Sequence, residues 1–152
     1  MEQAELYQDI ILDHARHPRN FHAMEAPSQF AHGDNPLCGD NVTVYLRLGG
    51  GRIEGISFEG RGCAVSTASA SLMTEVLQGK TVPEAEVLLG DFQARVTGGA
   101  AVAVPPELAE AAEKLEPLTG VRAFPSRVKC ATLAWHAFAA ALRGGGETVK
   151  TE

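Results

Sequence analysis

The sequence predicts an α+β fold, in which a small antiparallel sheet of about three strands is covered by helices. Two observations predict it. Apolar and polar residues alternate from Val42 to Leu48, which is the period of a half-buried strand, and a second run of this kind extends from Ile53 to Glu59. Beyond residue 62 the apolar spacing becomes that of helices. Strands followed by helices are typical of α+β proteins.

The elements before and within the sheet follow from local patterns. A helix is expected from Ala4 to His17, because Pro18 ends its apolar spacing. An irregular stretch rich in Pro, Gly, Asn and Asp then runs to Asp40, with a short strand expected at 29–31. Three glycines at 49–51 turn the hairpin, and a bulge at 54–55 accounts for Ile53, which is out of step with the rest of its strand.

The second half of the chain is expected to be helical. A serine-rich helix follows residue 62 and ends at Gly79, and its run of small residues suggests close packing against another helix. One or two short helices are expected between 81 and 119, and a last helix has Pro125 in its first turn. Residues 1–143 are predicted to form one domain, and residues 144–152 a flexible tail.

Composition excludes several classes of protein. With 152 residues the chain fits one domain. Its formal charge of −6 makes it unlike a nucleic-acid-binding protein, which usually has an excess of basic residues. No apolar run approaches the length needed to span a bilayer, and the N-terminus lacks the pattern of a secretory signal. A cytoplasmic protein is therefore expected. In that reducing compartment, an odd set of three cysteines is not a disulfide framework.

The three cysteines leave three interpretations open, namely buried packing, a catalytic thiol with two bystanders, and metal ligands. Cys38 lies in a loop before the hairpin, Cys63 at the junction of sheet and helix, and Cys130 early in the last helix. Helix N-termini favour the thiolate form of cysteine, which is the form that binds metals. Free cysteines are nevertheless among the most buried residues, so spacing alone does not decide between packing and a metal site.

Two further residues extend the metal interpretation. Asp40 follows Cys38 by two residues with a glycine between them, so that sulfur and oxygen can point to one place, although an aspartate here also suits an ordinary turn. Three thiolates and one carboxylate complete a tetrahedral zinc site. Arg127, one helical turn before Cys130, can offset the negative charge of such a site. Among the histidines, only His32 is a minor alternative ligand.

Four segments together resemble the U-type iron–sulfur cluster assembly proteins, the family of IscU, SufU and the N-terminal domain of NifU. They are LYQDIILDHARHPRNF, NPLCGD, GRGCAVSTASASLMTE and RVKCATLAWHAF. The resemblance implies an α+β fold of the SufE/NifU type with a metal site at one exposed end. By match to these motifs, the implied ligands are Cys38, Asp40, Cys63 and Cys130.

One position indicates a branch of this family. In the IscU scaffold branch a histidine directly precedes the third cysteine, whereas this chain has Lys129 there. The segment between the second and third cysteines also looks longer than in that branch. Both features, together with Arg127, resemble SufU, a branch associated with tightly bound zinc and with sulfur transfer from a pyridoxal-phosphate cysteine desulfurase.

The resemblance therefore implies an iron–sulfur assembly protein that binds zinc and accepts sulfur from a cysteine desulfurase. We expect Cys38 to be the acceptor, since a loop thiol can swing out, and Arg127 to be a charge partner or to exchange with a ligand. One alternative is a scaffold on which Cys38, Cys63 and Cys130 hold a transient iron–sulfur cluster for later assembly factors or cluster-accepting proteins. Another is zinc that only stabilises the fold. Whether the protein is an enzyme stays open; at most it is a sulfurtransferase acting with the desulfurase.

Overall fold

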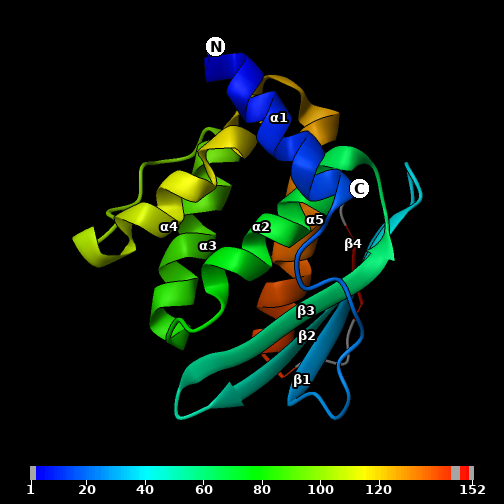
Figure 1. Ribbon diagram of the computed structural model, residues 1–152, viewed down its shortest axis with the longest axis vertical. Helices are drawn as coiled ribbons and strands as arrows, with labels where there is room; N and C mark the ends of the chain where they lie inside the picture. Colours follow the sequence, from blue (N-terminus) through cyan, green and yellow to red (C-terminus); the bar gives the residue numbers. More distant parts are fainter. Residues whose placement is uncertain (1–2, 145–147, 151–152) are drawn as a thin grey trace.

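Figure 1 shows the computed structural model, which describes residues 3–144 and 148–150. Three antiparallel strands, β1 (Gln29–Asn35), β2 (Asp40–Gly49) and β3 (Arg52–Arg61), form the sheet, and helices cover it. The predicted α+β class is confirmed. The short strand expected at 29–31 is longer than predicted, because its whole length pairs with β2.

The hairpin between β2 and β3 has the predicted turn and bulge. Gly50 and Gly51 adopt φ angles of 61° and 74°, which glycine reaches without a steric penalty. Arg47 pairs with Gly55 and Leu48 with Ile53, so Glu54 is the extra residue of the bulge. Ile53 lies before the bulge and Ile56 and Phe58 lie after it, and all three are buried in the same core as the apolar residues of β2.

The helices follow in the order α1 (Gln3–Arg16), α2 (Ala64–Leu77), α3 (Val82–Thr97), α4 (Ala109–Lys114) and α5 (Pro125–Leu142). Short 3-10 helices, η1 (Pro106–Leu108) and η2 (Glu116–Ala123), flank α4. The prediction of only short helices between 81 and 119 is wrong for α3. Thr81 and Glu84 cap each other's backbone at its start and Gly98 ends it, so that one helix of 16 residues runs between these two caps.

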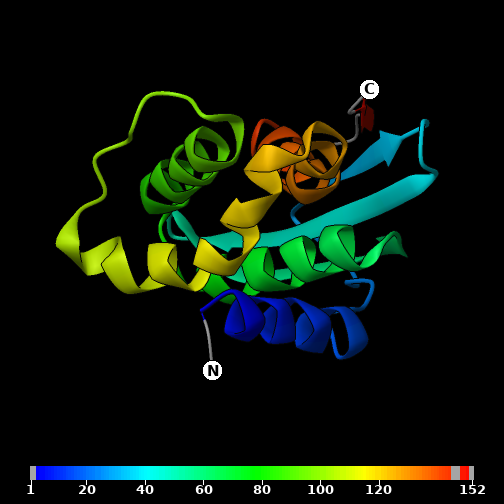
Figure 2. The same ribbon diagram turned by 90° about the horizontal axis from the view of Figure 1, so that it is seen from above.

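The core lies between the sheet and the two helices α2 and α5. Helix α5 packs on β1 and β2, and α2 packs on β3 and on α5. The inward side chains of β2 are fully or almost fully buried there, as is Trp135 of α5. Helix α1 lies outside this layer, alongside α2, as the view from above shows (Figure 2). None of the helices in the described ranges is both long enough and apolar enough to cross a bilayer.

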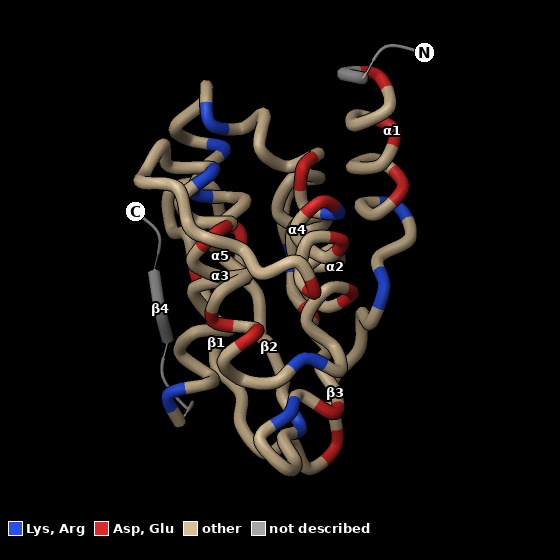
Figure 3. Tube along the Cα trace, turned by 90° about the vertical axis from the view of Figure 1, so that its left-hand side faces the viewer, with Lys and Arg blue, Asp and Glu red and all other residues tan. Residues whose placement is uncertain are grey.

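Charge and the C-terminal segment complete the architecture. Acidic residues recur along α1, on the outside of the molecule (Figure 3). Within the predicted tail, Thr148–Lys150 form β4, which pairs in parallel with β1 at His32–Asp34. It adds a fourth strand to the sheet, at the edge opposite β3. Residues 145–147 and 151–152 lie outside the described residues. The flexibility of the tail and the domain boundary at residue 143 stay predictions.

Candidate metal centre

Three separate parts of the chain meet at one end of the molecule. They are the turn between β1 and β2, the segment between β3 and α2, and the first turns of α5 (Figure 1). The turn supplies Cys38 and the first residue of β2 is Asp40, while α5 supplies Cys130. One ligand atom from each of these three side chains lies within 4.8 Å of the other two. Two thiols and a carboxylate this close together form a potential metal site.

The turn that carries Cys38 is held by its own backbone. The N–H groups of Cys38 and Gly39 donate to the Asn35 carbonyl at 3.3 and 2.9 Å, and the Asn35 side chain accepts from Leu37. Gly39 has a φ of 78°, which lets the chain reverse and enter β2. Cys38 is left exposed on this turn.

Asp40 provides a test of whether a metal fits. The side chain is only 5% exposed, and its Oδ1 accepts from the backbone N–H of Cys63 at 3.3 Å. Its Oδ2 is buried and has no hydrogen-bond partner among the described residues. Such an atom costs free energy unless something pairs with it. Because the Asp40 carboxylate belongs to the group of close ligand atoms, a cation bound there would supply the missing partner.

Cys63 borders the group from the side of α2. It is the N-cap of that helix, and its sulfur accepts from the Ser66 N–H at 3.5 Å. Its sulfur is not within the group defined by the 4.8 Å limit, but Cys63 contributes to the electrostatic surroundings of Cys130. The preceding Gly62 leaves room for this approach, since a Cβ there would lie 2.8 Å from Ser66 Oγ and 3.4 Å from the Asp40 carboxyl carbon.

Cys130 is the sixth residue of α5 and is 9% exposed. Burial raises the pKa of its thiol well above the ordinary range, and the neighbouring Cys63 and Asp40 raise it further. Without a bound metal, the lowered pKa expected near a helix start is not found for Cys130, which lies beyond the first turn of α5, where the helix dipole acts. A cation bound here would favour the thiolate, and its binding would release the thiol proton.

A pair of hydrogen bonds joins α2 to α5 next to Cys130. Ser69 Oγ donates to the carbonyl of Ala131 at 2.5 Å and accepts from Trp135 Nε1 at 3.1 Å. All three groups are buried, so these bonds add a specific polar link to the apolar packing of the two helices. The prediction that the serine-rich run serves close helix packing is confirmed.

A groove of about 430 Å³ opens beside the site, between the β1–β2 turn and the start of α5. Cys38, Cys130, Arg127 and Lys129 line it, together with Asn35, Leu37, Pro125 and Ser126. Arg127 is exposed, with its guanidinium carbon 5.8 Å from the centroid of the Phe124 ring. None of the ion pairs found in the described ranges includes Arg127, and its role at the site stays a prediction.

His32 does not reach the site. It is on the exposed face of β1, where its Nδ1 shares a hydrogen bond of 2.7 Å with Thr43 Oγ1. It is not part of the group of ligand atoms found in the described ranges.

Residues 6–131 match a protein family described as the NifU-like N-terminal domain. The chain belongs to this family. The resemblance noted from the sequence is thereby confirmed. The matched region of this NifU-like domain contains all of the candidate ligands.

Relatives of this NifU-like domain carry two kinds of name. A protein of Streptococcus pyogenes serotype M1, "Iron-sulfur cluster assembly scaffold protein IscU", is 37% identical over 91% of this chain and 83% of its own length. "Zinc-dependent sulfurtransferase SufU" of Bacillus subtilis (strain 168) is also 37% identical, over 87% of this chain and 86% of its own. The domain is thus equally similar to a protein named as a scaffold and to one named as a sulfurtransferase.

A solved structure shows the same fold. It is described as a putative iron–sulfur cluster assembly scaffold protein for the SUF system (FiSufU) from Fervidobacterium islandicum AW-1. It superposes on the NifU-like domain with a TM-score of 0.79 at 29% identity, over 93% of this chain and 99% of the other. The expected SufE/NifU type of architecture is confirmed.

Proposed function

We propose that this NifU-like domain binds one zinc ion through Cys38, Asp40, Cys63 and Cys130, and accepts sulfur from a pyridoxal-phosphate cysteine desulfurase during iron–sulfur cluster assembly. The observation that carries the metal site is the close grouping of Cys38, Asp40 and Cys130 around a buried carboxylate oxygen without a partner. Thiolates with one carboxylate suit zinc. The name of the Bacillus subtilis relative, a zinc-dependent sulfurtransferase, supports the same conclusion.

Cys38 is the residue best suited to accept the sulfur, because its thiol is exposed on a turn while Cys130 is buried in a helix. Bound zinc would supply the positive charge that keeps the surrounding thiols ionised at neutral pH. The Cys38 thiolate attacks the outer sulfur of the persulfide on the desulfurase. The S–S bond of that persulfide breaks, and its electron pair leaves with the cysteine sulfur of the desulfurase.

Arg127 is proposed as the charge partner of the site. It lines the groove beside Cys38 and Cys130, and its exposure leaves the guanidinium free to pair with a thiolate or to take the place of a leaving ligand. We place the reaction in the cytoplasm, where reducing conditions keep all three thiols available. The sulfur would then pass to later assembly factors or cluster-accepting proteins.

A second candidate function is that of a cluster scaffold, and the name of the Streptococcus pyogenes relative favours it. The donor set argues for zinc, because a carboxylate is a hard ligand and Lys129 stands where the scaffold branch has a histidine. Zinc with a purely structural role is a third candidate. The exposed thiols of Cys38 and Cys63 argue against it, since they are open to a reaction partner, which a purely structural site does not need.

The test combines metal content with sulfur transfer. Protein purified without oxygen is expected to contain about one zinc ion per chain and to be colourless. After incubation with the desulfurase and cysteine, a persulfide should be found on Cys38, and Cys38→Ser should abolish it. A brown protein with iron and sulfide would support the scaffold instead. Zinc without any persulfide would leave only the structural role.

A further inference from the structure

Two cationic side chains line the groove beside the site. Arg127 and Lys129 share it with Cys38 and Cys130, whereas Asp40 and Cys63 are not among its walls. The groove therefore combines two cationic side chains with the exposed cysteine that is proposed as the sulfur acceptor. Sulfur that arrives on Cys38 would enter the space that these two side chains border.

The two cations differ in their surroundings. Arg127 is exposed, lies over the Phe124 ring and also borders a second, mainly apolar groove of about 420 Å³ between α1 and the start of α5. Lys129 is half-buried, and no ion pair within the described ranges includes it. A partly desolvated ammonium without a carboxylate partner favours an anion in the groove that it lines.

We propose that Lys129 binds the terminal sulfur of a persulfide on Cys38. The inference rests on the sulfur-acceptor function proposed above. When Cys38 takes the outer sulfur of the desulfurase persulfide, the transferred sulfur gives its proton to solvent and becomes the terminal anion of Cys38–S–S⁻. The Lys129 ammonium stabilises this anion, so the equilibrium of the transfer shifts toward the NifU-like domain.

Lys129 is proposed to change the equilibrium of sulfur transfer. This effect can be separated from any effect on binding between the two proteins. Once the two proteins have dissociated, the partition of sulfur between them depends on the stability of each persulfide and not on how tightly the proteins bind. Loss of an interaction between Lys129 and the terminal sulfur should lower the ratio of loaded to unloaded Cys38 about fivefold. Salt should weaken the same interaction, because the Debye length falls to about 3 Å at about 1 M ionic strength.

The experiment mixes desulfurase carrying a persulfide, freed of cysteine, with equimolar zinc-loaded domain. After equilibration, mass spectrometry of the alkylated peptide gives the fraction of loaded Cys38. Lys129→Gln is compared with wild type and with Lys129→Arg, which keeps the charge. Lys114→Gln on α4 is the matched control, since it removes the same charge from an exposed position away from this groove. Zinc content is measured for every variant.

The expected result is an about fivefold lower loading ratio for Lys129→Gln, restored to within about twofold by Lys129→Arg, with the difference shrinking at high salt. Equal loading of Lys129→Gln and Lys114→Gln would overturn the inference and leave the proposed function intact. The inference would also be overturned if Lys129→Arg loaded as poorly as Lys129→Gln and high salt did not reduce the difference from wild type. Such a result would show a structural effect of the substitution. No persulfide on Cys38 in the wild type would instead refute the proposed function itself.

Discussion

Asp40 is the residue whose environment most directly favours a cation, because its buried Oδ2 has no hydrogen-bond partner among the described residues. Asp40→Ala removes one of four ligands and leaves water to replace it, so zinc should be lost to a chelator at least about tenfold faster, while the three thiolates still hold the metal weakly. Competition with a coloured chelator measures this rate. Asp34→Ala is the control, because Asp34 lies on the opposite side of β1 from the core. Equal release from both variants would exclude Asp40 as a ligand.

Arg127 should matter for sulfur transfer more than for the fold. Its side chain is exposed, so Arg127→Ala should change the free energy of unfolding by no more than about 0.5 kcal/mol. Stimulation of the desulfurase should fall about tenfold, since the positive charge beside the thiols is lost. Urea denaturation and a sulfide assay measure the two effects. Arg122→Ala is the control, because it removes another exposed arginine, outside the groove that contains Cys38. Unchanged transfer by Arg127→Ala would refute its role.

Between elements, the hydroxyl of Ser69 links α2 to α5 through two buried hydrogen bonds. Ser69→Ala leaves the buried Trp135 N–H and the Ala131 carbonyl without their partner, which should cost about 1–3 kcal/mol of unfolding free energy. Trp135→Phe removes the unpaired N–H, so the double variant should be more stable than the sum of the two single changes predicts. Urea unfolding of the three variants tests this. Strict additivity would show that the hydroxyl does not couple the two helices.

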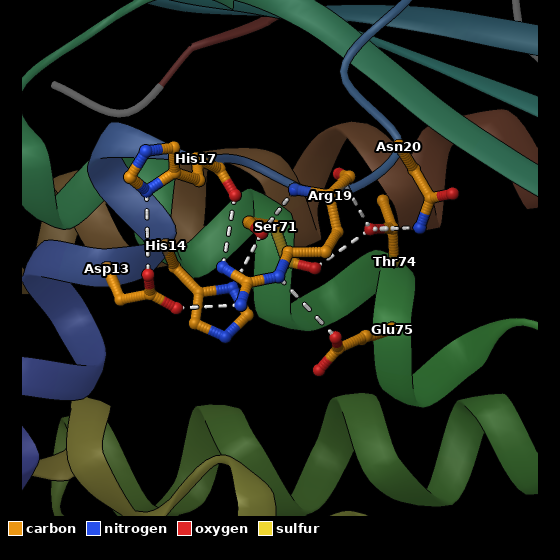
Figure 4. Close-up of polar contacts among 8 residues, drawn as sticks. All are labelled: Asp13, His14, His17, Arg19, Asn20, Ser71, Thr74 and Glu75. Carbon is orange, nitrogen blue, oxygen red and sulfur yellow. Dashed lines mark hydrogen bonds and ion pairs between the residues drawn. The ribbon is translucent and has the colours of Figure 1, made fainter.

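The contact between α1 and α2 depends on a buried histidine (Figure 4). His14 is 6% exposed, and its Nδ1 shares a hydrogen bond of 2.7 Å with Ser71 Oγ, which also accepts from the Arg19 backbone. Burial lowers the pKa of His14, and the charge of Arg19 lowers it further against the opposing effects of Glu75 and Asp13. The folded protein therefore favours neutral His14.

This environment predicts a pH dependence of stability. Below about pH 6.5 the unfolded chain binds a proton on His14 that the folded protein resists, so the free energy of unfolding should fall as the pH drops through that range. Burial also lowers the pKa of His136, so the comparison uses a His136→Gln background. There, adding His14→Gln should flatten the decline measured by urea unfolding between about pH 7.5 and about pH 5.5. An identical decline in both proteins would contradict the prediction.

At the scale of the whole molecule, bound zinc should stabilise the fold, because its proposed ligands come from several different elements. These are the β1–β2 turn, the start of β2, the N-cap of α2 and the body of α5. Free zinc at a hundredfold excess over Kd adds about 2.7 kcal/mol of stability, which corresponds to a rise in Tm of about 5–10 °C for a domain of this size. Thermal unfolding with and without chelator measures the shift. Cys130→Ser should lose most of it, and a wild type with the same Tm in both conditions would refute this stabilisation.

The local order of the fold could be predicted from local patterns. Alternation along Val42–Leu48 identified a strand with one buried face, and Ile53 out of step predicted the bulge that Glu54 forms. Helix α3 was predicted too short, although Thr81 and Glu84 form the capping box that could have been recognised in the sequence. In each case the information lies within a few residues of chain.

The sequence by itself determined the fold class, the family and the identities of the candidate ligands, because these depend on residue periodicity and on short motifs. Only the tertiary structure decided which groups meet, because such contacts depend on packing between segments far apart in the chain. It brought Cys130 close to Cys38 and Asp40, buried Asp40 Oδ2 without a partner, and paired His14 with Ser71. It also reversed the expected pKa of Cys130, since burial is a property of the packed molecule.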